Sequence, residues 1–193
     1  MSIPEAAGKA KTWILDGFLG NGDRFEALRR RVAEKVGPAD IWRYQTSGVT
    51  PIDYLGRVFR DILEWERGPV HLIGYSMGGL VVRAALAHRP LPALSKVVFL
   101  NVPHHGTAWG HVVPLPAVRQ MQPHSALLNR LNRQRWEVPT LNVWCPGDLM
   151  ILPGWSSRFP LASREEVCRV PAHLWPVYAP YWHARAVDFL MDY

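Results

Sequence analysis

The stretch PVHLIGYSMGGLVVRAALAHRP, residues 69–90, decides the fold. It begins with a short apolar run, typical of a buried strand, and continues with apolar residues at helical spacing. Ser76 stands between the two parts, flanked by Gly74 and Gly78 in a G-x-S-x-G pattern. Where a strand turns at once into a helix, side chains beside the turn would collide with the neighbouring backbone, so glycines are needed there. We therefore expect the turn to expose the Ser76 hydroxyl at a sheet edge. The alternative is a Gly-Ser turn that merely reverses the chain.

The rest of the chain also alternates between short apolar runs and amphipathic segments. Strands are expected at Thr12–Leu15, Asp40–Tyr44, Val70–Gly74, Lys96–Asn101, Leu141–Trp144 and Val167–Val170. Helices are expected at 25–36, 52–62, 78–88 and 180–193, the second opened by a capping Thr50 with Pro51 at its first position. This order indicates an α/β fold, with a mainly parallel sheet of about six strands and helices on both faces. We expect one domain over residues 1–193, with residues 1–11 as a flexible N-terminal extension.

Composition narrows the class of protein. Hydrophobic residues make up 48% of the 193 residues and charged residues 20%, as in a globular domain. The N-terminus lacks the apolar core of a signal peptide, and no run approaches the about 18 apolar residues of a membrane span, so we expect a cytoplasmic protein without a stable membrane anchor. The net charge is +6, but the basic residues are spread out and match no nucleic-acid-binding motif, so no nucleic-acid partner is expected. The pair Cys145 and Cys168 fits neither a zinc nor a disulfide pattern. Nothing in the sequence indicates an oligomeric state.

Two further segments supply the partners that a nucleophilic serine needs. A serine hydroxyl is a poor nucleophile without a base, and the base needs an orienting carboxylate. On a parallel sheet these groups lie on loops after the strands, in the chain order Ser, acid, His. Asp148 follows the fifth expected strand and His173 the sixth, which matches that order. The competitors are His183 for the base and Asp16 or Asp188 for the acid, and Asp148 has the alternative role of a turn-forming residue.

The oxyanion of an acyl-transfer intermediate needs two backbone N–H donors. Met77 follows the serine and begins a helix, whose dipole favours negative charge. The second donor is expected from the loop DGFLG at 16–20, at Phe18. This glycine-rich loop has neither a Walker lysine nor G-x-G-x-x-G spacing, so a phosphate site is not favoured.

Taken together, these segments resemble the α/β-hydrolase superfamily, specifically the small bacterial lipases and esterases with little or no lid. The resemblance covers about 13–190 and rests on GYSMGG, NVPHHGT (101–107), MQPHSALLNRLN (121–132), CPGDLMILP and VPAHLWPVY. It implies a minimal six-stranded hydrolase that cleaves carboxylic esters without a cofactor. Ser76 would be the nucleophile, Asp148 the acid, His173 the base, and the Phe18 and Met77 amides the oxyanion donors.

One residue departs from that family. Its first loop usually reads His-Gly, whereas this chain has Asp16-Gly17. A carboxylate there would interact electrostatically with His173 or disfavour anionic substrates. His104, His105 and His111 lack an accompanying carboxylate or cysteine ligand, so rim or supporting roles are expected rather than a metal site.

Apolar residues gather on the segments after the strands and would line an acyl pocket. The expected substrate is a small-molecule acyl ester, in contact with Leu19, Trp109, Met150, Ile151 and Trp175. A thioesterase, an amidase or an acyltransferase would use the same triad. A hydrolase fold used only for binding is the alternative from a different class.

Overall fold

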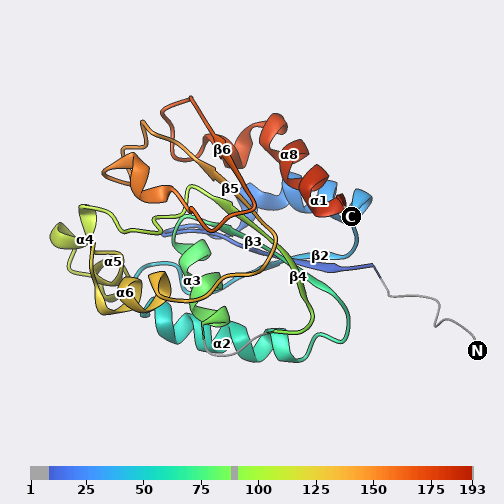
Figure 1. Ribbon diagram of the computed structural model, residues 1–193, viewed down its shortest axis with the longest axis horizontal. Helices are drawn as coiled ribbons and strands as arrows, with labels where there is room; N and C mark the ends of the chain where they lie inside the picture. The colour runs from blue at the N-terminus through green and yellow to red at the C-terminus, as the bar shows by residue number, and fades with distance from the viewer. Residues whose placement is uncertain (1–8, 88–90, 193) are drawn as a thin grey trace, which may run out of the picture.

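Six parallel strands form one sheet through the centre of the protein (Figure 1). The computed structural model describes residues 9–87 and 91–192. The order across the sheet is β2-β1-β3-β4-β5-β6, and every neighbouring pair is parallel. The strands span Lys11–Leu15 (β1), Ala39–Trp42 (β2), Val70–Tyr75 (β3), Leu94–Leu100 (β4), Thr140–Trp144 (β5) and Arg164–Val167 (β6).

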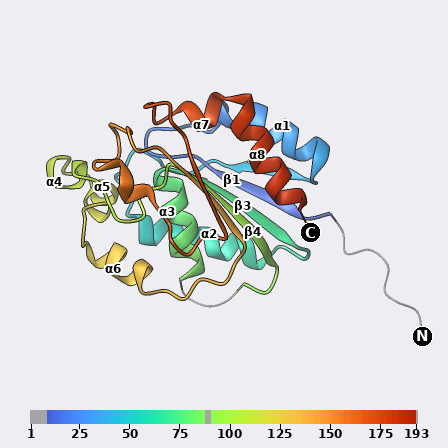
Figure 2. The same ribbon diagram turned by 45° about the horizontal axis from the view of Figure 1, so that its top comes forward.

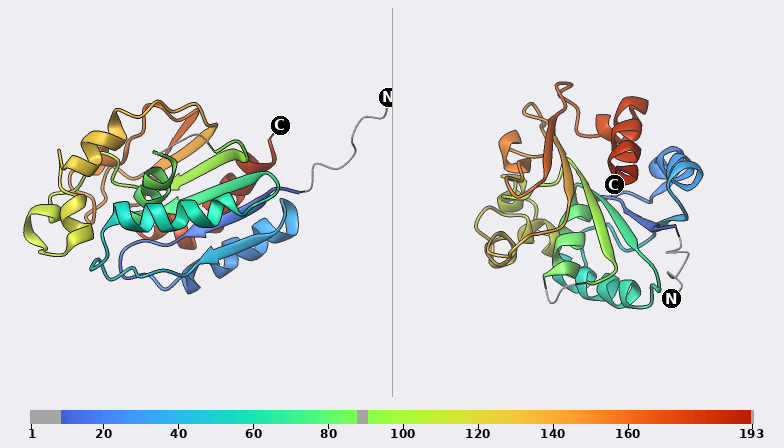
Figure 3. Two further views of the ribbon diagram at one scale, coloured as in Figure 1. Left: turned by 90° about the horizontal axis from the view of Figure 1, so that it is seen from below. Right: turned by 45° about the vertical axis from the view of Figure 1, so that its right-hand side comes forward.

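Helices cover both faces of the sheet, which confirms the predicted fold class (Figure 3). One face packs against α1 (Glu26–Lys35) and α8 (Pro180–Met191), and the other against α2 (Ile52–Glu64) and α3 (Met77–Leu86). The shorter elements are η1 (Asp23–Phe25), α4 (Trp109–Val112), α5 (Pro116–Gln120), α6 (Ala126–Asn132), η2 (Gly154–Ser157) and α7 (Trp175–Tyr178). Within the described ranges, no helix has the length and apolar character needed to cross a bilayer.

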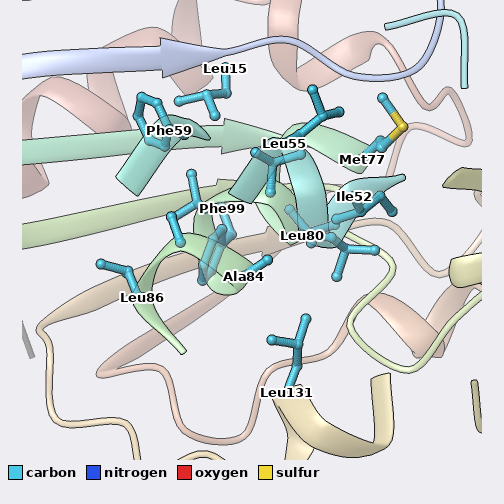
Figure 4. Packing of buried hydrophobic residues seen from close by; sticks show 14 of the residues in the cluster. Leu15, Ile52, Leu55, Phe59, Met77, Leu80, Ala84, Leu86, Phe99 and Leu131 are labelled. Carbon is cyan, nitrogen blue, oxygen red and sulfur yellow. The ribbon is translucent and has the colours of Figure 1, made fainter. Parts of the chain in front are cut away.

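Successive strand residues feed two separate cores. On β4, Val97 and Phe99 join the α2 and α3 side, whereas Val98 and Leu100 join the α1 and α8 side. Figure 4 shows the first of these cores, with Phe99 among α2 and α3 side chains. Because both faces are covered, all six residues of β3 are buried, and a buried parallel strand reads as a continuous apolar run.

The prediction for the sixth strand is wrong in position. The expected run was Val167–Val170, but β6 is Arg164–Val167 and pairs with β5 from Leu141↔Arg164 to Trp144↔Val167. The strand lies at the sheet edge and is polar, so its apolar content did not mark it. Its Glu165 carboxylate accepts from the side-chain nitrogen of Asn142 at 3.0 Å, and this contact holds the edge.

Other expected boundaries also differ, among them the end of the second strand, which is Trp42 rather than Tyr44. β1 begins at Lys11, inside the segment expected to be a flexible extension, because the Lys11 amide donates to Pro69 O at 2.9 Å. Residues 1–8 of that segment, like His88 and Tyr193 of the expected helices, lie outside the described residues. The N-cap of α2 is Pro51 rather than Thr50, because the Gln120 side chain accepts from the Ile52 amide at 2.6 Å.

The chain changes direction between β1 and β3. β2 lies on one side of β1, and the chain then crosses to place β3 on the other side. At such a switch point the loops after the two strands diverge and leave a crevice at the carboxyl edge. The loop after β1 and the turn at Ser76 therefore lie side by side: a Cβ built on Gly17 would be 2.7 Å from the Ser76 Cβ.

A buried histidine on β3 predicts loss of stability in acid. Burial, with a smaller contribution from Lys96, lowers the pKa of His71 from 6.5 to about 4. Between pH 6.5 and 4, His71 is protonated in the unfolded chain but remains neutral in the folded chain. The free energy of unfolding therefore falls as pH decreases toward 4. Between pH 7.5 and 5.0, His71 accounts for a loss of about 2 kcal/mol, measured by urea denaturation. His71→Val should remove this contribution to the pH dependence. If the free energy of unfolding changed with pH in the same way in both proteins, the prediction would be contradicted.

Candidate functional site

Ser76 lies in a sharp turn between the end of β3 and the start of α3. Its backbone has φ 50° and ψ −126°, a conformation that costs a non-glycine residue about 1–3 kcal/mol. The Ser76 amide donates to Leu100 O on β4 at 3.0 Å, and Ser76 O accepts from the Gly79 amide at 3.1 Å. The neighbouring strand and the new helix thus hold the strained turn in place.

The glycines of the turn are required by close approach. A Cβ on Gly74 would be 2.5 Å from the Gly79 Cα, and one on Gly78 would be 2.4 Å from Asp16 O. These contacts are backbone, so nothing can shift to make room. The G-x-S-x-G pattern therefore reflects packing against the helix and against the loop after β1.

Ser76, His173 and Asp148 form one continuous line of hydrogen bonds. His173 Nε2 lies 2.9 Å from Ser76 Oγ, and His173 Nδ1 lies 2.5 Å from Asp148 Oδ2. Because a carboxylate oxygen accepts, Nδ1 carries the proton and Nε2 is free to accept from the serine hydroxyl. The other oxygen of Asp148, which is 1% exposed, accepts from the amides of Met150 at 2.8 Å and Ile151 at 3.2 Å.

Two residues that the sequence did not single out hold the His173 backbone. The Asn101 side-chain nitrogen donates to His173 O at 2.8 Å, and the Tyr75 hydroxyl donates to the same oxygen at 3.4 Å. Asn101 follows β4 directly and has φ 45°, a conformation that asparagine tolerates better than most residues. An asparagine placed directly after a buried strand was the available signal.

Two backbone amides flank Ser76 without a partner among the described residues. In the loop after β1, the Gly20 amide donates to Gly17 O at 3.0 Å and the Leu19 amide donates to Thr46 O at 2.9 Å. The Phe18 amide between them donates to no described group. Met77 is the first residue of α3, where amides have no partner inside the helix. Both amides are thus available to an anionic oxygen beside Ser76.

The carboxylate of Asp16 is paired. Asp16 is 1% exposed, and Arg24 Nε lies 2.8 and 2.9 Å from its two oxygens. The same carboxylate accepts from the amides of Gly17 at 2.6 Å and Gly22 at 3.0 Å. It therefore ties together both ends of the loop that carries Phe18, and Arg24 balances its charge close to His173.

A cleft of about 510 Å³ opens beside Ser76 and His173. Of the expected substrate-contacting residues, Trp109, Met150 and Ile151 line it. Leu19 and Trp175 do not line it and are exposed to solvent. The remaining walls are mostly apolar, so an uncharged chain fits them better than a polar one.

Helix α5 adds a wall that the sequence analysis missed. Val118, from this helix, and Met121, directly after it, line the cleft and are nearly buried. Their apolar spacing after the β4 loop was a signal for a packed helix, and only tertiary structure turns that helix toward Ser76. Arg24 also lines the cleft, and its guanidinium lies 5.3 Å from the centre of the Tyr75 ring.

Two other histidines, His183 and His104, are held by packing and hydrogen bonds away from Ser76. His183 on α8 donates through Nε2 to Val177 O at 2.6 Å, and burial lowers its pKa. His104 is fully buried, its ring stacks on Phe159 with centroids 4.4 Å apart, and burial holds its pKa well below 6.5. No group of three or more His, Cys, Asp or Glu within residues 9–87 and 91–192 could hold a metal ion.

Comparison with known proteins identifies solved structures of the same shape. The mature lipase BlEst2 of Bacillus licheniformis superposes with a TM-score of 0.75 at 14% identity, over 98% of this chain and 95% of that one. The monoacylglycerol lipase of Paleococcus ferrophilus superposes with a TM-score of 0.72 at 16% identity, over 93% of each chain. A bromoperoxidase of Bacillus anthracis gives 0.72 at 13% identity, over 96% of this chain and 93% of that one. No protein-family model and no curated protein matches the sequence.

The Asp16–Arg24 pair predicts a stability change that needs no activity assay. Asp16→Asn leaves the Arg24 charge, whose side chain is 18% exposed, without a counterion. The expected loss in the free energy of unfolding is about 2–4 kcal/mol, measured by urea denaturation. The double variant with Arg24→Met removes both charges and recovers part of that loss.

Asp23→Asn is the matched control in the same loop. It breaks the exposed pair with Arg43, whose partners are 66% and 59% exposed, and should cost less than about 1 kcal/mol. Equal losses for the two single variants would show that Asp16 and Arg24 do not hold the loop.

Proposed function

The protein has the α/β-hydrolase fold, and from this premise we propose that it is a serine hydrolase that cleaves carboxylic esters. The observation that carries the proposal is the line of hydrogen bonds from Ser76 Oγ through His173 to Asp148. The fold does not decide the chemistry, because structures named as lipases and as a bromoperoxidase share it. The proposal is therefore supported by the site, which combines a serine, a base, an acid and two available amides.

In the proposed reaction, Ser76 Oγ attacks the ester carbonyl while His173 Nε2 takes its proton. Asp148 holds Nδ1–H and stabilises the imidazolium that forms. The Phe18 and Met77 amides donate to the oxyanion, and one such donor is typically worth about 3 kcal/mol. The tetrahedral intermediate then collapses, the carbon–oxygen bond to the alcohol breaks, and the alcohol leaves with the proton from His173. Water repeats the sequence on the acyl-enzyme and releases the acid.

The cleft favours an ester with an apolar acyl chain. Its walls include Val118, Met121 and Trp109. Each methylene of an acyl chain that leaves water for such walls makes binding more favourable. Water is also excluded from the acyl-enzyme by such a surface. No cofactor is part of the proposed reaction.

Covalent labelling tests the nucleophile. A fluorophosphonate should add once per chain, at Ser76, as read by intact mass and peptide mapping, because only an activated serine displaces fluoride. Ser76→Ala should give no adduct. Folded wild-type protein that stays unlabelled would overturn the proposal.

Activity on a soluble nitrophenyl ester tests the other two roles. His173→Ala and Asp148→Asn should each lower kcat by a factor of about 10²–10⁴ with near-normal urea denaturation. His183→Gln is the matched control, since its amide still donates to Val177 O. Loss of activity in that control, with His173→Ala active, would move the base to His183. Matched thioesters separate an esterase from a thioesterase.

Filling the cleft tests where the acyl chain lies. Val118→Phe adds volume at a wall that is 3% exposed, and should lower kcat/KM for an octanoate ester by a factor of about 10 or more. An acetate ester should be hardly affected. Val112→Phe on neighbouring α4, at a side chain 71% exposed, is the control. An equal loss for both esters would contradict an acyl chain against Val118.

A further inference from the structure

Exposed apolar side chains are concentrated at one end of the protein. Five segments follow the carboxyl ends of β1, β2, β4, β5 and β6, and we call them the carboxyl-edge rim: 16–25, 43–51, 101–125, 145–157 and 168–179. Eleven of the seventeen exposed large hydrophobic side chains of the described residues lie in this rim: Leu19, Val49, Trp109, Val112, Leu149, Met150, Val170, Trp155, Leu174, Trp175 and Tyr178.

Part of the rim lies at the mouth of the cleft. Trp109, Met150 and Leu174 line the cleft and are at the same time 41%, 53% and 39% exposed. Figures 1 and 2 both place α4 at the end of the molecule opposite the C-terminus. Exposed apolar side chains that gather at a cleft mark a site of contact more often than ones scattered singly over a surface.

Exposed positive charges outnumber exposed negative charges in the rim. Its three aspartates are Asp16 and Asp148, both 1% exposed, and Asp23, which is paired with Arg43. Arg119 and Arg169 are exposed and have no carboxylate partner within the described ranges. The whole chain carries a net charge of +6. Apolar side chains with basic neighbours suit a surface that is apolar inside and negative outside.

We propose that the carboxyl-edge rim docks on an anionic lipid surface and presents the cleft mouth to acyl chains in it. This inference deepens the proposed function, on which it rests for the statement that the cleft takes an acyl ester. Docking would bury the exposed aromatic and aliphatic side chains among acyl chains and place Arg119 and Arg169 near lipid phosphates. The acyl chain could then enter the cleft without crossing water.

Co-sedimentation with vesicles measures docking separately from catalysis. Wild-type protein should bind vesicles of phosphatidylcholine and phosphatidylglycerol at least about tenfold more tightly than pure phosphatidylcholine, and 0.5 M salt should weaken that preference. Val112→Ser with Trp155→Ser should reduce binding to the mixed vesicles about tenfold or more. Neither side chain lines the cleft, so hydrolysis of a soluble ester should persist.

Trp65→Ser is the matched control. Trp65 is 77% exposed and follows α2 at the amino edge of the sheet, so its loss should leave vesicle binding unchanged. Arg119→Gln with Arg169→Gln should abolish the preference for phosphatidylglycerol while leaving binding to neutral vesicles unchanged.

The outcomes separate docking from catalysis. Equal vesicle binding by the rim variant and the Trp65 control would overturn the proposed surface. Intact ester hydrolysis without vesicle binding would overturn docking but not the proposed hydrolase function. Self-association of the wild-type protein that the rim variant removes would do the same, because the rim would then be a contact between copies of the chain. Vesicle binding without fluorophosphonate labelling would support docking and overturn the hydrolase proposal.

Discussion

The close approach of the Ser76 turn to the loop after β1 is the constraint on which the site depends. Gly78 lies against Asp16 O, and Gly17 lies against the Ser76 side chain. This contact fixes where the serine hydroxyl stands relative to the Phe18 amide. It exists because the sheet changes direction between β1 and β3, which brings two loops from distant parts of the chain to one crevice. The strain stored at Ser76 is held by hydrogen bonds to β4 and α3.

Buried polar groups position the other components of the site. Asp148 is held by two amides of its own loop, and His173 is held through its carbonyl by Asn101 and Tyr75. The Asp16 carboxylate holds the loop after β1, with Arg24 as its counterion. These contacts fix the Asp148 carboxylate, the His173 backbone and the loop after β1, and such supporting contacts keep a site within the narrow geometry that transfer of a proton requires.

The same edge of the sheet combines a polar interior with an apolar exterior. Asp16 and Asp148 are buried, whereas Leu19 and Trp155 are exposed in the same two loops. Helices cover both faces of the sheet and keep the core closed without help from these side chains. Their exposure therefore does not serve the stability of the fold, since an apolar side chain in water contributes no burial.

The sequence by itself determined the fold class, the turn at Ser76 and the order of Asp148 and His173, because apolar periodicity and close packing at glycine are local properties. It misplaced β6, since an edge strand with polar residues has no apolar pattern to read. The contacts of Arg24, Asn101, Val118 and Met121 with the site were decided only by tertiary structure. Arg24, Val118 and Met121 line the cleft, and Asn101 contacts His173 O, because the strand order brings the loops after different strands to one edge.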